Sequence, residues 1–154
     1  MAIPKGWVPL DFGGMFDHLD THFMVHIGPV YMREQDGARQ LGFEVLPHMC
    51  NPAGICHGGM LMSVMDVGLA FILHNAMGRH VFTPSVSFNF DFIAPGQMGD
   101  FLICEGACTR HTKNTGFVTG RLIGKDGPVI TGSGIMKITK RYEAEFGAES
   151  GKTT

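Results

Sequence analysis

The sequence is poor in the features that mark several common classes of protein. Only four of its 154 residues are cysteines, and no two have the Cys-x-x-Cys spacing of zinc ribbons or thioredoxin-type sites. Basic and acidic side chains nearly balance, at 12 and 14, so we expect no nucleic-acid partner. The first residues lack the apolar run of a signal peptide. These absences favour a single cytoplasmic domain with reduced thiols.

One stretch of the chain is apolar on almost every side. Residues 58–77 contain no proline, and Gly78 supplies a stop, so the stretch predicts a buried helix of roughly 30 Å. That length would also cross a membrane. The run is interrupted by four polar residues, Ser63, Asp66, His74 and Asn75. Because strand-like segments follow as well, a core helix is favoured and no membrane partner is expected.

The remaining segments predict strands joined by short turns, which implies antiparallel pairing. They cover residues 28–35, 39–46, 85–93, 100–110, 115–123 and 129–139. In residues 85–93, an apolar set alternates with a polar set that consists of Ser85, Ser87, Asn89 and Asp91. One apolar helix wrapped by a curved antiparallel sheet of about six strands is the α+β arrangement called the hotdog fold. We expect a lead over 1–27, this domain over 28–140, and a flexible tail over 141–154.

A histidine face is predicted in the lead. His18, His22 and His26 recur every four residues within a predicted short helix over 15–26, so they would share one side. They could chelate a metal, or they could form a polar or interface face. The sequence places no further acidic or cysteine ligand near them. We therefore expect no metal and no cofactor.

The apolar helix and its flanks carry a family resemblance. The residues are Asn51-x-x-Gly54-x-x-His57-Gly58-Gly59, then Asp66, then the strand end Phe92-Ile93-Ala94-Pro95. Over roughly residues 28–140 the pattern resembles hotdog acyl-CoA thioesterases of the phenylacetic-acid-degradation type. The resemblance implies hydrolysis of an aryl- or fatty-acyl-CoA to free acid and coenzyme A. It also implies a homodimer with shared sites, which commonly pairs into a tetramer.

Two features of the helix suit that chemistry. Gly58 and Gly59 offer peptide N–H groups at the positive end of the helix dipole, where an oxyanion could form. The alternative is that they only allow a tight entry to the helix. Asp66 is the candidate general base or nucleophile, because a carboxylate in an apolar helix is costly without a task. The alternative is a buried aspartate that bonds to backbone or to a partner subunit.

The spacing of these two features predicts a dimer. Gly58 and Asp66 are eight residues apart, which is about 12 Å along a helix axis. A reacting carbonyl should lie about 3 Å from both groups. One chain cannot supply both to one site, so a two-fold partner must contribute one of them.

Three further residues have weaker catalytic signals. Asn51 could orient water or bind the carbonyl, although an Asx-turn before Pro52 explains it too. His57 could position Asn51 or its loop. On the resemblance, Ser85 matches the position that assists the aspartate. Cys56 as a thiol nucleophile is less favoured, because the sequence places no orienting third group beside it.

Coenzyme A would bring phosphates and an adenine to the site. Candidate cations are Arg110, Lys113 and Arg121, with turn N–H groups from Asn114 and Thr115. The resemblance implies nucleotide contacts from residues 92–97, which include Phe92 to Pro95, and from residues 110–115. Gly59 would lie against the substrate. The alternative for the cations is an ordinary solvated surface.

Other functions remain open at this point. Phe71, Phe88 and Phe90 could line an acyl pocket with the methionines of the helix, or simply fill the core. A hotdog acyl-CoA or acyl-carrier-protein hydratase is a second enzymatic interpretation. A non-catalytic acyl-CoA binding module is a third.

Overall fold

The computed structural model describes residues 3–11 and 23–140. Its centre is a single helix, α2 (Gly58–Met77), with the bounds that the sequence predicts. The helix ends at Gly78, whose φ of 64° is left-handed and therefore suits glycine. Its buried residues lie on more than one side: Met60, Leu61, Val64, Met65, Gly68, Leu69 and Leu73.

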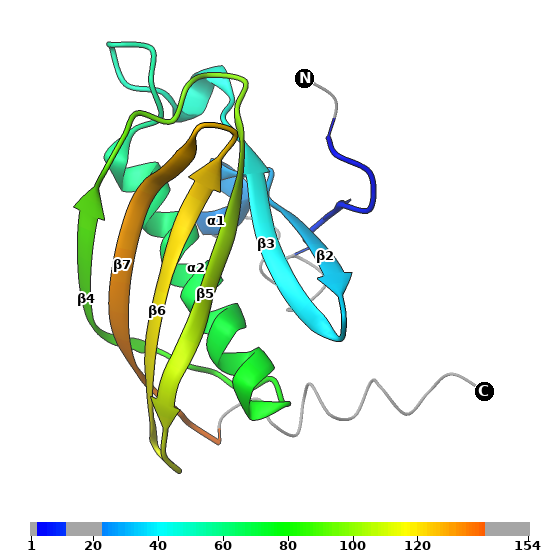
Figure 1. Ribbon diagram of the computed structural model, residues 1–154, viewed down its shortest axis with the longest axis vertical. Helices are drawn as coiled ribbons and strands as arrows, with labels where there is room; N and C mark the ends of the chain where they lie inside the picture. The colour runs from blue at the N-terminus through cyan, green and yellow to red at the C-terminus, as the bar shows by residue number, and fades with distance from the viewer. Residues whose placement is uncertain (1–2, 12–22, 141–154) are drawn as a thin grey trace.

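Within the described residues, an antiparallel sheet of seven strands wraps this helix (Figure 1). The strands are β1 (Val8–Pro9), β2 (Tyr31–Gln35), β3 (Ala38–Glu44), β4 (Ser85–Phe92), β5 (Phe101–His111), β6 (Thr115–Gly124) and β7 (Gly127–Lys137). Their order is β1-β2-β3-β5-β6-β7-β4, so β4 forms one edge. A short 3-10 helix, η1 (Pro47–Met49), precedes the loop into α2. The predicted α+β hotdog architecture is confirmed.

The strand that the sequence did not predict is β1, at the other edge of the sheet. Val8 pairs with Met32 of β2, and the preceding Trp7 is buried. The Trp7 ring meets Phe101 edge-on at 5.1 Å, and the Arg33 guanidinium lies 4.9 Å from its centre. Part of the lead therefore packs on the same sheet. A two-residue strand has no periodicity to detect.

The start of the chain also contains the helix α1 (Phe23–Ile27). Of the predicted helix over 15–26, residues 23–26 are helical, and residues 15–22 lie outside the described residues. His26 lies in α1 and is exposed. His18 and His22 lie outside the described residues.

Glycine lets the helix and the sheet approach closely. A Cβ on Gly68 of α2 would collide with the Cys104 side chain of β5. A Cβ on Gly120 of β6 would lie 2.9 Å from Leu69. The inner face of the sheet and one side of α2 therefore share a core, which includes Leu41, Phe43 and Val45.

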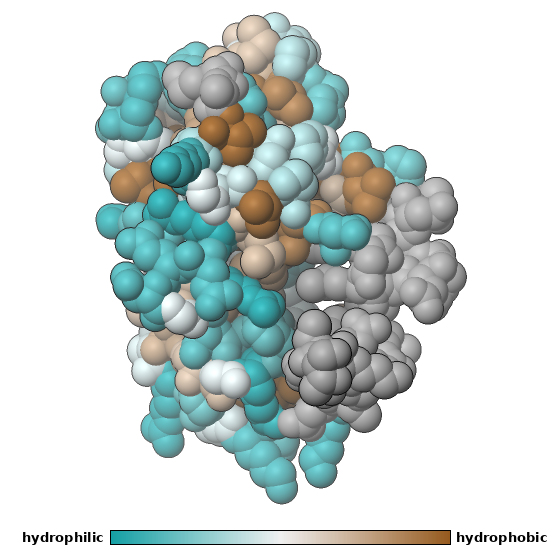
Figure 2. All heavy atoms as spheres, turned by 90° about the vertical axis from the view of Figure 1, so that its right-hand side faces the viewer, coloured by the Kyte–Doolittle hydropathy of each residue, from teal (hydrophilic) through white to brown (hydrophobic). Residues whose placement is uncertain are grey.

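The apolar length of α2 is explained by this packing. By length and composition the helix could cross a membrane. In the fold it is the core helix behind the sheet (Figure 1). From the side of β2 and β3, hydrophobic groups reach the surface mainly in the upper half, towards the end where α2 begins (Figure 2).

Candidate active site

The loop that leads into α2 is a closed turn. Cys50 and Cys56 face each other as an isolated antiparallel bridge, and Asn51 N–H donates to Ile55 O at 2.8 Å. The Asn51 side-chain oxygen accepts from Ala53 N–H at 2.9 Å, which is an Asx-turn. Among the described residues, its amide nitrogen donates to no acceptor. Asn51 therefore shapes the loop and retains a donor for a ligand.

His57 caps the helix through its side chain. Its Nδ1 accepts from Gly59 N–H at 2.9 Å, so a neutral ring carries its hydrogen on Nε2. The Gly59 N–H is thereby occupied. Within the described part of the chain, the N–H of Gly58 donates to no acceptor. The donor available to an oxyanion at the helix start is thus the one on Gly58.

A β-bulge changes the orientation of the first residue of β4. Ser85 pairs with Met136 of β7, whereas Ser87 pairs with Ile135, so Val86 is the extra residue. Met136 is buried on the helix side, and Ser85 shares that face. The predicted alternation, which placed Ser85 and Ser87 on the same face, is wrong at this position because the bulge shifts the register. Strict alternation cannot reveal a bulge.

The consequence is a short hydrogen bond between the edge strand and the helix. Ser85 Oγ donates to Asp66 Oδ1 at 2.6 Å. Asp66 is half-buried, and its second oxygen accepts no hydrogen bond from the described residues. One carboxylate oxygen is therefore held in place while the other stays available to water or substrate.

The other end of β4 lies against the helix start. A Cβ on Gly58 would lie 3.1 Å from the Phe92 ring, so this ring covers the first turn of α2. Gly58 therefore neighbours Phe92, and Asp66 neighbours Ser85, at opposite ends of the same strand. Along the helix axis the two groups are separated by about 12 Å. Within one chain they remain two separate half-sites.

Residues 92–97 continue from Phe92 along the helix start. Cys56 N–H donates to Gly96 O at 2.8 Å, and Ile55 forms a bridge with Gln97. The strand end thus lies beside the loop that carries Asn51. All of residues 92–97 except Gly96 are exposed: Phe92, Ile93, Ala94, Pro95 and Gln97. The structure brings these candidates together with His57 and Gly58.

The second group of coenzyme A candidates lies at the β5–β6 hairpin, far from the helix start (Figure 1). The Thr112 hydroxyl accepts from the N–H groups of Asn114 and Thr115, at 3.3 and 3.1 Å. These turn donors are therefore occupied. Lys113 is exposed at the tip. Arg121 bonds to Glu105 at 3.3 Å instead.

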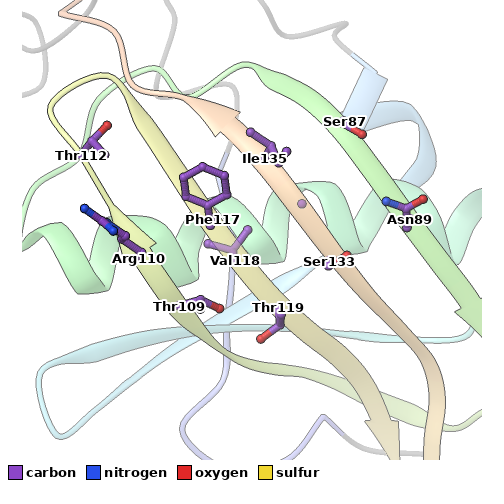
Figure 3. A pocket seen from close by; sticks show the side chains of 11 residues that line it. Ser87, Asn89, Thr109, Arg110, Thr112, Phe117, Val118, Thr119, Ser133 and Ile135 are labelled. Atoms are coloured by element: carbon purple, nitrogen blue, oxygen red, sulfur yellow. The ribbon is translucent and has the colours of Figure 1, made fainter.

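Arg110 lies on the outer face of the sheet, away from α2. It helps line a hollow of about 660 Å³ on the strands β4 to β7. In Figure 3, Arg110, Phe117 and Ile135 stand on this face while α2 runs behind the strands. Asp66 and Ser85 are on the opposite face. Arg110 could contact a ligand bound at Asp66 and Ser85 only if that ligand extended around the end of the sheet.

A smaller cavity of about 370 Å³ lies between α1 and the start of α2. Its lining combines apolar side chains with polar groups: Phe23, His26, Ile27, His48, Met49, His57, Gly59, Met60 and Ser63. His48 Nε2 bonds to Gly28 O at 3.0 Å. His48 and Ser63 are neighbours of the site that were not predicted from the sequence. No local pattern marks them, because the fold alone brings α1 to this place.

Other chemistries find less support at this site. Burial, and secondly the neighbouring Cys50, raises the pKa of the Cys56 thiol to about 12. This opposes a thiolate nucleophile. Over residues 3–11 and 23–140, no cluster of histidine, cysteine and acidic residues could hold a metal ion.

Comparison with known proteins gives matches over most of the chain. A model of a family described as the thioesterase superfamily matches residues 53–131, just over half of the chain. A Pseudomonas aeruginosa protein named as a candidate esterase is 28% identical over 142 residues. That match spans 90% of this chain and 98% of the relative.

Solved structures agree with the fold. The Escherichia coli PaaI protein of the phenylacetic acid degradation operon has a TM-score of 0.63 and 21% identity, over 71% of this chain and 79% of its own. A hypothetical thioesterase from Streptococcus pneumoniae, solved with coenzyme A, has a TM-score of 0.62 and 18% identity. The match covers 71% of this chain and 88% of that one. At these identities the likeness shows a shared fold.

Proposed function

The chain belongs to the thioesterase superfamily, and from this premise we propose that it hydrolyses an acyl-CoA to a free acid and coenzyme A. The observation that carries the proposal is the hydrogen bond from Ser85 to Asp66, at 2.6 Å. It fixes a half-buried carboxylate beside an open sheet edge. The aryl or fatty nature of the acyl group is part of the same proposal.

At Asp66 the free carboxylate oxygen takes a proton from water as that water attacks the thioester carbonyl. The carbon–sulfur bond then breaks, and coenzyme A leaves as a thiolate. Direct attack by Asp66, through a mixed anhydride that water later opens, uses the same geometry. In both routes Ser85 is a positioning residue, because it holds the oxygen that does not react.

At the helix start, the N–H of Gly58 receives the negative charge that develops on the carbonyl oxygen. It lies at the positive end of a 20-residue helix, which favours an anion. The nearby amide nitrogen of Asn51 and the Nε2–H of His57 offer further donors. These groups must serve the Asp66 of another protomer, because their own lies about 12 Å along the helix.

The edge strand β4 is the proposed contact between protomers. It pairs with β7 on one side, and no other strand of the described residues covers its second side. The strand exposes Val86 (65% accessible) and Phe92 (55%), and the next residue, Ile93, is 55% accessible. A long apolar edge is a template for pairing with another chain. Two copies of β4 would join antiparallel about a two-fold axis.

This symmetry would bring the half-sites together. Ser85 and Phe92 are the two ends of β4, so an antiparallel β4 pair centred on its middle sets each Ser85 beside the partner's strand end. On α2, the residue midway between Gly58 and Asp66 is Met62, which is 41% exposed. An axis near Met62 would set the Gly58 of one protomer opposite the Asp66 of the other. The middle of β4 and Met62 of α2 could therefore both lie near the same two-fold axis.

Coenzyme A would then cross between protomers. The exposed strand end at Phe92 to Pro95 lies beside one half-site, and the β5–β6 hairpin with Lys113 lies towards the Ser85 end of the sheet.

The outer hollow with Phe117 and Ile135 is the proposed contact between two dimers. A cytoplasmic location fits the four free thiols.

The test is release of coenzyme A from a panel of aryl- and fatty-acyl-CoAs, with product acids identified by mass spectrometry. Asp66→Asn keeps the shape of the side chain and removes the base, so kcat should fall by roughly 10²–10⁴ while the dimer persists. Undiminished turnover by Asp66→Asn and Asp66→Ala would refute this role for Asp66.

The parent protein separates the other functions. Water added across an enoyl double bond, without coenzyme A release, would make the protein a hydratase. Binding of coenzyme A without turnover of any panel member would make it a binding module.

A further inference from the structure

The two cysteines that frame the Asn51 loop are paired by the backbone. His57 N–H donates to Met49 O and Asn51 N–H donates to Ile55 O, both at 2.8 Å. Cys50 and Cys56 lie between these bonds and oppose each other directly. This is the non-hydrogen-bonded pair of an antiparallel bridge, whose Cα atoms lie about 4.5 Å apart with side chains on the same side.

That spacing falls within the range of a disulfide. Bridged cysteines have Cα atoms about 4.4–6.8 Å apart and Cβ atoms about 3.5–4.5 Å apart. In the structure both thiols are free: Cys50 Sγ points to Leu46 O at 3.5 Å, and Cys56 Sγ to His57 O at 3.9 Å. Both contacts are long and weak, so these hydrogen bonds offer little resistance to rotation of the two sulfur atoms towards each other.

The chain contains a matched pair without this geometry. Cys104 and Cys108 are four residues apart on β5, which separates their Cα atoms by about 13 Å. They cannot be bridged in the folded protein. Any difference between the two pairs in the native state therefore reports backbone geometry.

We infer that Cys50 and Cys56 form a redox-active dithiol, which a low-molecular-weight disulfide such as oxidised glutathione converts reversibly into an intramolecular bond. The bond closes the ring that contains Asn51 and ends at the residue before His57. An oxidant thereby acts on the loop that builds the start of α2. This inference does not depend on the reaction that the site catalyses.

The exchange balances in two steps. The Cys50 thiol, which is half-exposed, loses its proton, attacks oxidised glutathione and displaces one glutathione thiolate. The Cys56 thiol then loses its proton, attacks the Cys50 sulfur of the mixed disulfide and displaces the second glutathione thiolate. Two protein thiols are oxidised and one glutathione disulfide is reduced to two thiols. Burial raises the pKa of Cys56 to about 12, which lowers its thiolate fraction and slows the second step.

Trypsin separates the two pairs for measurement. Cleavage after Arg39, Arg79 and Arg110 puts Cys50 and Cys56 in the peptide 40–79, and Cys104 and Cys108 in the peptide 80–110. The full-length native protein is equilibrated in glutathione buffers of graded ratio, quenched with acid, alkylated and digested. Mass spectrometry then counts free thiols in each peptide. A parallel sample in denaturing urea shows what either pair does without the fold.

We expect peptide 40–79 of the native protein to lose two hydrogens and both alkylation sites, and to recover them in reduced glutathione. The oxidised fraction should exceed that of peptide 80–110 by at least about tenfold, and this preference should vanish in urea. Cys50→Ser and Cys56→Ser should each abolish it, while Cys104→Ser should not. Two free thiols in native peptide 40–79 at every ratio, a glutathione adduct that persists on Cys50, or equal oxidation of both peptides would overturn the inference.

Discussion

The two halves of the proposed site are built from different parts of the chain. At the Gly58 end the proposed oxyanion donor is a backbone N–H, and the surrounding loop is fixed by main-chain hydrogen bonds such as Cys56 N–H to Gly96 O. At the Asp66 end it is a side chain, fixed by one hydrogen bond from Ser85 across a β-bulge. The first half should therefore resist most side-chain changes. The second should depend on a few side chains and on the segment that carries Ser85.

Among changes that leave Asp66 itself intact, the largest loss of activity is expected at Gly58. Proline at the first helical position removes the N–H and keeps the helix, and His57 already has the extended backbone that proline requires before it (φ −63°, ψ 136°). Gly58→Pro should lower kcat by about 10²–10³. Gly58→Ala adds the same Cβ beside Phe92 and keeps the N–H, so it is the matched control.

Steady-state kinetics on both variants give kcat, and circular dichroism checks that the helix is retained. Equal losses in Gly58→Pro and Gly58→Ala would show that crowding at Phe92, and not the N–H, controls the rate.

A second test concerns the segment that leads to Ser85. His74 of α2 donates from Nε2 to Val81 O at 2.9 Å, and its buried Nδ1 has no hydrogen-bond partner among the described residues. Burial first, then the neighbouring His80, lowers the pKa of His74 to about 4. In the unfolded chain His74 binds a proton near pH 6.5, whereas in the folded chain it binds one only near pH 4. Stability should therefore fall as pH drops through this window and stay constant above it.

Between pH 7 and pH 5 this should remove ~2 kcal/mol of the free energy of unfolding, measured by urea titration at one protein concentration. His74→Gln retains a donor for Val81 and does not titrate, so its loss should be smaller by that amount. His80 titrates in both proteins and cancels in the difference. If the free energy of unfolding falls equally with pH in the parent and in His74→Gln, the pH dependence does not come from His74.

The smallest effect is expected from Ser85→Ala. It deletes the hydrogen bond to Asp66 without removing the carboxylate, so kcat should fall about tenfold with KM nearly unchanged. Ser87→Ala, on the outer face of the same strand, should behave like the parent. An equal effect of the two substitutions in the same kinetic assay would indicate a general weakening of β4.

Much of the fold follows from local pattern. The bounds of α2 are predictable because an apolar run without proline ends at a glycine. The β2–β3 hairpin is predictable because the dipeptide Asp36-Gly37 favours the positive φ angles of a tight hairpin turn. In the structure these angles are 54° and 75°. Asp66 stands out because a lone acid in a buried helix is expensive.

The rest depends on contacts between distant segments. The bulge at Val86 leaves no mark in a run of alternating residues, yet it decides that Ser85 reaches Asp66. The capping bond of His57 removes Gly59 as a donor, which the pair of glycines does not reveal. Likewise the cavity at His48 exists only because α1 folds back onto α2.

Mixing two inactive variants tests the central claim most directly. Asp66→Ala and Gly58→Pro protomers are dissociated together and reassembled, and coenzyme A release is compared with the unmixed variants. If each site takes Gly58 from one protomer and Asp66 from the other, each mixed dimer regains one intact site, and a random mixture should recover about a quarter of the parent activity. If the mixture exchanges subunits and is no more active than its components, both groups act within one chain, and the shared site is wrong.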